Sequence, residues 1–194
     1  MSRVLAVSAC ALLLLGTAHV PGTPRLEVRT IDGRAWRPLE PGGAANVLFF
    51  VATDCPVSNA YAPEIQRICA AYQPKGVQCA LIYEDAGVTA REVRAHLDEH
   101  RYSGITAAVD GDASLAARVN ATITPEAVAI DRQGAVRYHG RIDNFYAALG
   151  RARQVVTEHD LRDALDAMLA GRTVAKTATE PIGCFIVPSN QRSK

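Results

Sequence analysis

The sequence contains no CxxC pair, no HExxH motif and no cluster of cysteine and histidine at zinc-ligand spacing, so a structural zinc site is not expected. The formal net charge is only +1, and no basic stripe with interleaved aromatic residues occurs, so nothing favours nucleic-acid binding. Internal repeats and low-complexity segments are absent too. What remains is an ordinary globular composition, 48% apolar and 21% charged, in a chain long enough for one domain with its own core.

The N-terminal segment has the pattern of a secretory signal. Arg3 precedes an apolar run over 4–15, and small or polar residues follow, so we expect cleavage after Ala18. The run is short for a membrane span. Two alternatives stay open: an uncleaved anchor, which would be the protein's one membrane contact, and lipid attachment at Cys10, which is disfavoured because Cys10 lies inside the apolar run. The pattern predicts an exported protein, periplasmic or secreted, in a compartment where disulfides persist.

The rest of the chain alternates between strand and helix patterns, which indicates an α/β sandwich. We expect a signal peptide over 1–18, a linker over 19–25, one domain over 26–172 and a C-terminal tail over 173–194. The predicted strands span 26–31, 46–52, 77–83, 105–109, 127–130 and 135–138. The predicted helices span 56–72, 89–100, 113–119 and 159–170, and the first should be kinked by Pro63.

The stretch 47–59 predicts a reactive thiol. Its apolar run has the length and the β-branched, aromatic character of a buried strand, and Pro56 suits the first position of a helix. Cys55 therefore falls where a strand passes into a helix, beside unpaired N–H groups and the positive end of the helix dipole, where a thiolate is favoured. Polar neighbours such as Asp54 predict that the site faces water. The alternative is a small buried cysteine that ends a strand.

Taken in order, the motifs resemble a thioredoxin-fold redoxin, close to the exported proteins of the alkyl hydroperoxide reductase and thiol-specific antioxidant (AhpC/TSA) family. The resemblance covers about residues 26–186 and rests on Thr53-Asp54-Cys55-Pro56, Pro63, Thr124-Pro125 before an Asp-x-x-Gly hairpin, 138–143, and Gly183-Cys184-Phe185-Ile186. It implies a thioredoxin-like three-layer α/β/α sandwich with a central mixed sheet and a catalytic Cys55. It also implies a cis peptide bond between Thr124 and Pro125, whose backbone pairs with a substrate chain in such folds.

The chain departs from the family pattern around Cys55. Thioredoxins carry a second cysteine where this chain has Ser58, and a serine cannot resolve a mixed disulfide. Peroxiredoxins place Thr or Ser three residues before the reactive cysteine and Pro seven before it, whereas this chain has Ala52 and Leu48. Efficient peroxide reduction is therefore less favoured. We expect Ser58 or backbone N–H groups to stabilise the thiolate, and Arg141 is a candidate for a nearby positive charge.

A thiol oxidoreductase needs a second thiolate to release its mixed disulfide. Removal of the signal leaves Cys55, Cys69, Cys79 and Cys184, which allow three complete pairings. Cys184 is the first candidate partner of Cys55, because its tail can return to the sheet edge and Gly183 permits a tight approach; a merely structural bond, or none, is the alternative. Cys69 and Cys79 occupy apolar segments and are expected to be inert or bonded to each other.

The resulting prediction is an exported thiol–disulfide oxidoreductase that acts on protein thiols or disulfides, with peroxides as a variant and with no cofactor. Cys55 attacks, Cys184 resolves, and Thr124-Pro125 orients the substrate. A second interpretation is a copper-binding module that uses Cys55, Cys184 and His139 as soft ligands. A third is a non-catalytic binding domain of the same fold. The remaining histidines on predicted helices are expected to be solvated: His96, His100 and His159.

Overall fold

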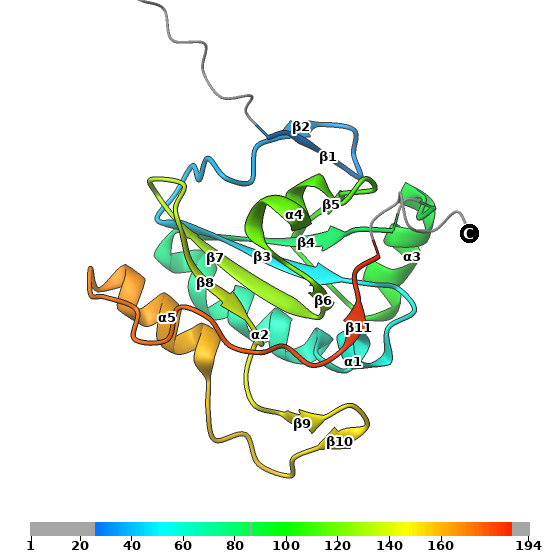
Figure 1. Ribbon diagram of the computed structural model, residues 1–194. Coiled ribbons are helices and arrows are strands. Elements are labelled where there is room, and N and C mark those ends of the chain that lie inside the picture. Colours follow the sequence, from blue (N-terminus) through cyan, green and yellow to red (C-terminus); the bar gives the residue numbers. More distant parts are fainter. Residues whose placement is uncertain (1–25, 86, 188–194) are drawn as a thin grey trace, which may run out of the picture.

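The computed structural model describes residues 26–85 and 87–187 (Figure 1). The predicted signal peptide and linker lie outside the described residues, as does the end of the C-terminal tail. Within the described ranges, no helix combines the length and the apolar character that a membrane crossing requires.

A mixed sheet of seven strands forms the centre of the structure. Its strands are β1 (Val28–Thr30), β2 (Ala35–Trp36), β3 (Ala45–Val51), β4 (Val77–Tyr83), β5 (Thr106–Val109), β7 (Glu126–Asp131) and β8 (Val136–Gly140). They lie in the order β2-β1-β5-β4-β3-β7-β8. The strands β3, β4 and β5 run parallel, and the remaining pairings are antiparallel. The predicted central mixed sheet is confirmed.

Helices cover both faces of the sheet (Figure 1). They are α1 (Pro56–Ala60), α2 (Ala62–Tyr72), a 3-10 turn η1 (Gln73–Lys75), α3 (Ala90–Glu99), α4 (Ser114–Val119) and α5 (Asp160–Leu169). One hydrophobic core joins α2, α3 and α5 to the sheet, and a second core lies on the other face under α4 and the N-terminal segment. This is the predicted three-layer α/β/α sandwich.

The central strand β3 is buried along its whole length. Val47, Phe49 and Val51 pack into the first core, while Leu48 and Phe50 point into the second. Because both faces of the strand are covered, its sequence is continuously apolar rather than alternating. Cys55 follows the carboxyl end of this strand, so a rigid element fixes its position.

The helix predicted over 56–72 is interrupted as expected. It divides at Tyr61 into α1 and α2, two residues before Pro63. A proline there cannot donate to the carbonyl of Asn59, and its ring crowds that carbonyl. The break separates the short turn that carries Cys55 from the longer helix that packs on the sheet.

Short strands outside the main sheet are the part of the fold that the sequence did not predict. They are β6 (Ile123–Thr124), β9 (Tyr146–Ala148), β10 (Arg151–Ala152) and β11 (Cys184–Phe185). The β9–β10 hairpin extends away from the sheet below α1 and α2 in the view of Figure 1. Strand β11 pairs antiparallel with β6, which places Cys184 opposite Thr124.

Backbone hydrogen bonds hold the C-terminal tail against β8 before the tail reaches β11. The backbone of His139 donates to the Thr177 carbonyl (3.0 Å) and accepts from the Thr179 N–H (3.1 Å). A side chain at Gly140 would overlap Thr179, so glycine is needed for this close approach. From here the tail crosses below the sheet to β6 (Figure 1).

Candidate active site

Cys55 is the N-cap residue of α1. Its backbone is extended, with φ −87° and ψ 110°, and Pro56 takes the first helical position. The sulfur accepts a hydrogen bond from the backbone N–H of Ser58 (3.4 Å). The predicted junction of strand and helix is therefore confirmed, and a backbone donor points at the sulfur.

The Thr124-Pro125 segment faces this sulfur from the other side. The peptide bond between the two residues is cis, as predicted. The Cys55 thiol donates to the Thr124 carbonyl, with 3.2 Å between Sγ and O. Both Thr124 and Pro125 are buried.

Cys184 completes the cluster. It lies opposite Thr124 across the β11–β6 pairing, and it packs against the core that contains Cys55, close enough for the two thiols to influence each other. Burial, followed by the neighbouring Cys55 thiol, raises the pKa of Cys184 to about 12. Both cysteines are free thiols in this structure. The fold thus brings together Cys55, Thr124, Pro125 and Cys184 from three distant parts of the chain.

The expectation that the reactive sulfur faces water is wrong. Asp54 and Pro56 are exposed, but Cys55 itself retains only 1% of its accessible surface. The cover comes from Thr124 and Cys184, which are remote in sequence. Local polarity therefore predicted the exposure of the loop but not that of the thiol.

Ser58 contributes its backbone rather than its hydroxyl. The side chain is buried, and its Oγ has no hydrogen-bond partner among the described residues; the same holds for Oγ1 of Thr124. Of the two ways in which Ser58 was expected to act on the sulfur, only the N–H contact is present.

A chain of hydrogen bonds connects His96 to the loop that carries Cys55. The prediction that His96 is solvated is therefore wrong. His96 keeps 5% of its accessible surface. Its Nδ1 lies 2.9 Å from the Tyr83 hydroxyl, and its Nε2 lies 2.9 Å from Oδ1 of Asn59. The amide nitrogen of Asn59 in turn donates to the Thr53 carbonyl (3.0 Å), two residues before Cys55. The sequence did carry a signal, because His96 follows the buried Val93 at helical spacing.

The chain of donors fixes the protonation of His96. Since Asn59 uses its amide hydrogen on Thr53, its oxygen must accept, and Nε2 of His96 must carry the proton. Nδ1 then accepts from the Tyr83 hydroxyl. Burial, and after it the charge of nearby His100, lowers the pKa of His96 to about 4. His96 is therefore a neutral bridge between the core of the sheet and the Cys55 loop.

Two other residues predicted to act at the site, Arg141 and His139, have carboxylates as neighbours. The Arg141 guanidinium binds Asp160 (2.8 Å) and Glu158 (2.9 Å). His139 lies 3.5 Å from a carboxylate oxygen of Glu126. Within the described part of the chain, no group of three or more His, Cys, Asp or Glu side chains is arranged as metal ligands. The structure therefore gives no support to Arg141 as the activating charge or to the copper interpretation.

The other two cysteines form a second close pair in the first core. Cys69 on α2 and Cys79 on β4 are both buried and both free. A hydrogen bond with Cys79, together with burial, raises the pKa of the Cys69 thiol far above its ordinary value. Such a pair is unreactive while it stays buried.

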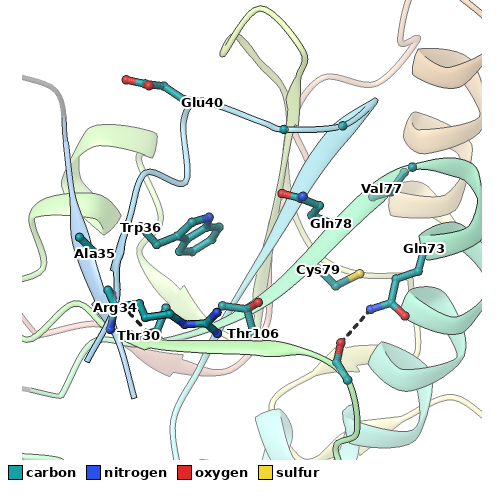
Figure 2. Close-up of a pocket in the computed structure, with 14 residues that line it drawn as sticks. Thr30, Arg34, Ala35, Trp36, Glu40, Gln73, Val77, Gln78, Cys79 and Thr106 are labelled. Atoms are coloured by element: carbon teal, nitrogen blue, oxygen red, sulfur yellow. Dashed lines mark hydrogen bonds between the residues drawn. The ribbon is translucent and has the colours of Figure 1, made fainter. Parts of the chain in front are cut away.

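A cavity of about 710 Å³ lies at the opposite end of the sheet, between the β1–β2 hairpin and the start of β4 (Figure 2). Trp36 and Arg34 lie on one side of it, and Gln78 and Cys79 on the other. It contains neither Cys55 nor Cys184. Because β3 and β4 begin near it and Cys55 follows the far end of β3, the thiol site is separate from this cavity.

Comparison with known proteins agrees with this geometry. Residues 40–145, more than half of the chain, match the family model described as Redoxin. The chain belongs to the Redoxin family. No curated protein matches this redoxin.

Several solved structures are similar to this redoxin. An uncharacterised conserved protein from Geobacillus kaustophilus is 25% identical, with a TM-score of 0.73 over 88% of this chain and 93% of its own. A hypothetical protein from Sinorhizobium meliloti is 24% identical, with a TM-score of 0.70 over 88% and 95%. A secreted Mycobacterium tuberculosis disulfide oxidoreductase homologous to Escherichia coli DsbE shares the fold, with 19% identity and a TM-score of 0.53 over 76% and 96%.

Proposed function

We propose that this redoxin is an exported thiol–disulfide oxidoreductase whose redox pair is Cys55 and Cys184. The observation that carries the proposal is the contact between the two thiols beside the Thr124 carbonyl. Two neighbouring thiols form a disulfide by losing two electrons and two protons to an oxidant, here the oxidised substrate. The signal-like segment 1–18 supports export, and so does the shared fold of a secreted disulfide oxidoreductase.

In the proposed reaction, the Cys55 thiolate attacks a sulfur of an oxidised substrate and expels the other sulfur as a thiolate. The N–H of Ser58 stabilises the charge on Cys55 before the attack. Cys184 then attacks Sγ of Cys55, which releases the substrate thiol and leaves a Cys55–Cys184 disulfide. Because β11 covers Cys55, a substrate reaches this sulfur only when β11 moves away from β6.

Protein disulfides fit the site better than a deeply bound small molecule. The hollow beside Pro125, which Tyr61 and Ile182 also line, measures about 10 Å³, about the space of one water molecule. The edge of β6, in contrast, already holds an extended chain in the form of β11. An extended segment of a partner protein is therefore the substrate class that we propose.

Peroxide reduction is the second candidate. The two hydroxyls without partners, on Ser58 and Thr124, belong to residues that contact the Cys55 sulfur, and a peroxide oxygen is a group that such hydroxyls could bind. The Cys55 thiolate would attack one peroxide oxygen, the O–O bond would break, and the other oxygen would leave as a protonated alcohol or water. The resulting sulfenic acid would react with the Cys184 thiol to give the Cys55–Cys184 disulfide and water. Rapid formation of sulfenic acid at Cys55 would favour this candidate.

Disulfide mapping tests the main proposal. We expect mass spectrometry of protein purified without reductant to find a Cys55–Cys184 linkage. We also expect Cys55→Ser to lose turnover of a peptide disulfide, while Cys69→Ser retains it. Full activity in the Cys55→Ser variant would refute the proposal.

A further inference from the structure

The two thiols of the proposed pair differ in solvent exposure. Cys55 keeps 1% of its accessible surface and belongs to the first core. Cys184 is partly exposed and sits on a surface strand, where the next residue, Phe185, is 81% exposed. A reagent that approaches the surface therefore meets Cys184 first.

The direction of attack strengthens this difference. A thiolate attacks a disulfide along the line of the two sulfurs, from the side opposite the sulfur that leaves. Such an approach needs open space at the sulfur that is attacked. Cys55 is buried with Val57 and Tyr61 in the first core, whereas Cys184 is only partly buried. Access therefore favours attack on Cys184.

The quality of the leaving group also favours attack on Cys184. Attack on Cys184 expels Cys55, whose sulfur receives the Ser58 N–H. Attack on Cys55 would instead expel Cys184, whose pKa is raised by burial and by the nearby carboxylates of Asp54 and Glu84. A thiolate that receives a hydrogen bond is a better leaving group, so the Ser58 N–H favours the departure of Cys55.

We infer that a dithiol partner, a protein or peptide with two thiols, reduces the Cys55–Cys184 disulfide by attack on Cys184. This inference rests on the proposed function. The first partner thiolate bonds to Sγ of Cys184, the bond between the two protein sulfurs breaks, and its electron pair stays on Cys55. The second partner thiolate attacks the first partner sulfur and expels Cys184. Two electrons pass to the protein, the partner becomes a disulfide, and two protons move from partner thiols to Cys55 and Cys184.

This assignment leaves β11 in place during the reduction. A partner chain need not compete for the edge of β6, which β11 already occupies. Oxidised substrates and the reducing partner would then use different sulfurs: the first needs β11 to move, and the second does not.

The test is to locate the mixed disulfide. The full-length oxidised protein is mixed briefly with glutathione, or with a short peptide that carries one cysteine. The reaction is quenched with acid, free thiols are alkylated with N-ethylmaleimide, and the products are mapped by mass spectrometry. We expect the thiol on Cys184 and the maleimide on Cys55, in at least about ten-fold excess over the reverse pattern.

The outcomes separate this inference from the proposed function. A Cys55–Cys184 disulfide that accepts the added thiol at Cys55, or at both sulfurs equally, overturns the inference and leaves the redox pair intact. Failure of the two cysteines to form a disulfide under any mild oxidant overturns both. A Phe185→Ala variant serves as a control for side-chain shielding, and its adduct should remain on Cys184.

Discussion

Cys184 lies directly opposite Thr124 in the antiparallel pairing of β11 with β6. Thr124 precedes the cis-proline, where folds of this kind are expected to pair with a substrate chain. The protein's own tail therefore takes the position that we assign to an oxidised protein substrate, and the tail and that substrate must compete for it. We test this contact, the hydrogen bonds of His96 and the ion pairs of Arg141 with four predictions.

Replacing Gly183 should uncover Cys55. A β-carbon at Gly183 would overlap the Thr124 carbonyl and crowd Ile123, so Gly183→Val should move β11 away from β6. We expect alkylation of Cys55 by N-ethylmaleimide in the reduced protein to rise by roughly ten-fold, which corresponds to about 1.4 kcal/mol of lost protection. Phe185→Ala, on the same strand with its side chain outward, should leave the rate unchanged. An equally slow reaction in Gly183→Val would show that β11 does not shield Cys55.

Removing the Ser58 hydroxyl should have little effect. Its Oγ has no partner among the described residues, and the contact with Cys55 comes from the backbone N–H, which Ser58→Ala keeps. We expect the free energy of unfolding to change by less than about 1 kcal/mol and the thiolate reactivity by less than about two-fold. Urea unfolding measures the first quantity, and the rate of thiol alkylation as a function of pH measures the second. A large loss of reactivity would assign a role to the hydroxyl.

The neutral state of His96 predicts a dependence of stability on pH. Its pKa in the folded protein is about 4, compared with 6.5 ordinarily, so the unfolded chain takes up this proton more readily. The contribution of neutral His96 to the free energy of unfolding is complete above about pH 6.5. It is lost as the pH falls towards 4, by at most about 1.4 kcal/mol per pH unit. Urea unfolding between these pH values should show this slope, and His96→Gln should reduce it. His159→Gln, at an exposed position, is the control and should retain the slope.

Arg141 should be a stability residue rather than an activator of Cys55. It pairs with Asp160, whose side chain is 1% exposed; although burial raises the pKa of that carboxyl, Arg141 and Lys176 hold it below the ordinary value. We expect Arg141→Gln to cost about 2 kcal/mol of unfolding free energy. Arg37→Gln, in an exposed pair with Glu27, should cost less than about 0.5 kcal/mol. A normal stability with slow alkylation of Cys55 in Arg141→Gln would reverse this assignment.

The sequence predicted the parts of the site that depend on local chemistry. A continuous apolar strand, a cysteine and a proline define the Cys55 junction because strand burial and helix capping act over a few residues. Thr124-Pro125 was predicted from the family resemblance, and the Asp131–Gly134 turn from its own residues; the structure has both.

The parts that were missed depend on contacts between distant segments. The burial of Cys55 comes from Cys184 and Thr124, and a strand as short as β11 has no periodicity that a sequence could show. His96 looked solvated because its helix is rich in charge, yet its position beside Val93 turns it inward to Asn59. In each case, a tertiary contact rather than a local preference determines the environment of the side chain.

The return of the tail to β6 also matters for how the protein is handled. A polyhistidine tag fused after Lys194 would be separated from Cys184 by only ten residues of chain. Imidazoles placed there could capture copper or nickel together with the sulfurs and imitate a metal centre. Tags placed before the domain, and removed before any titration, avoid this artefact.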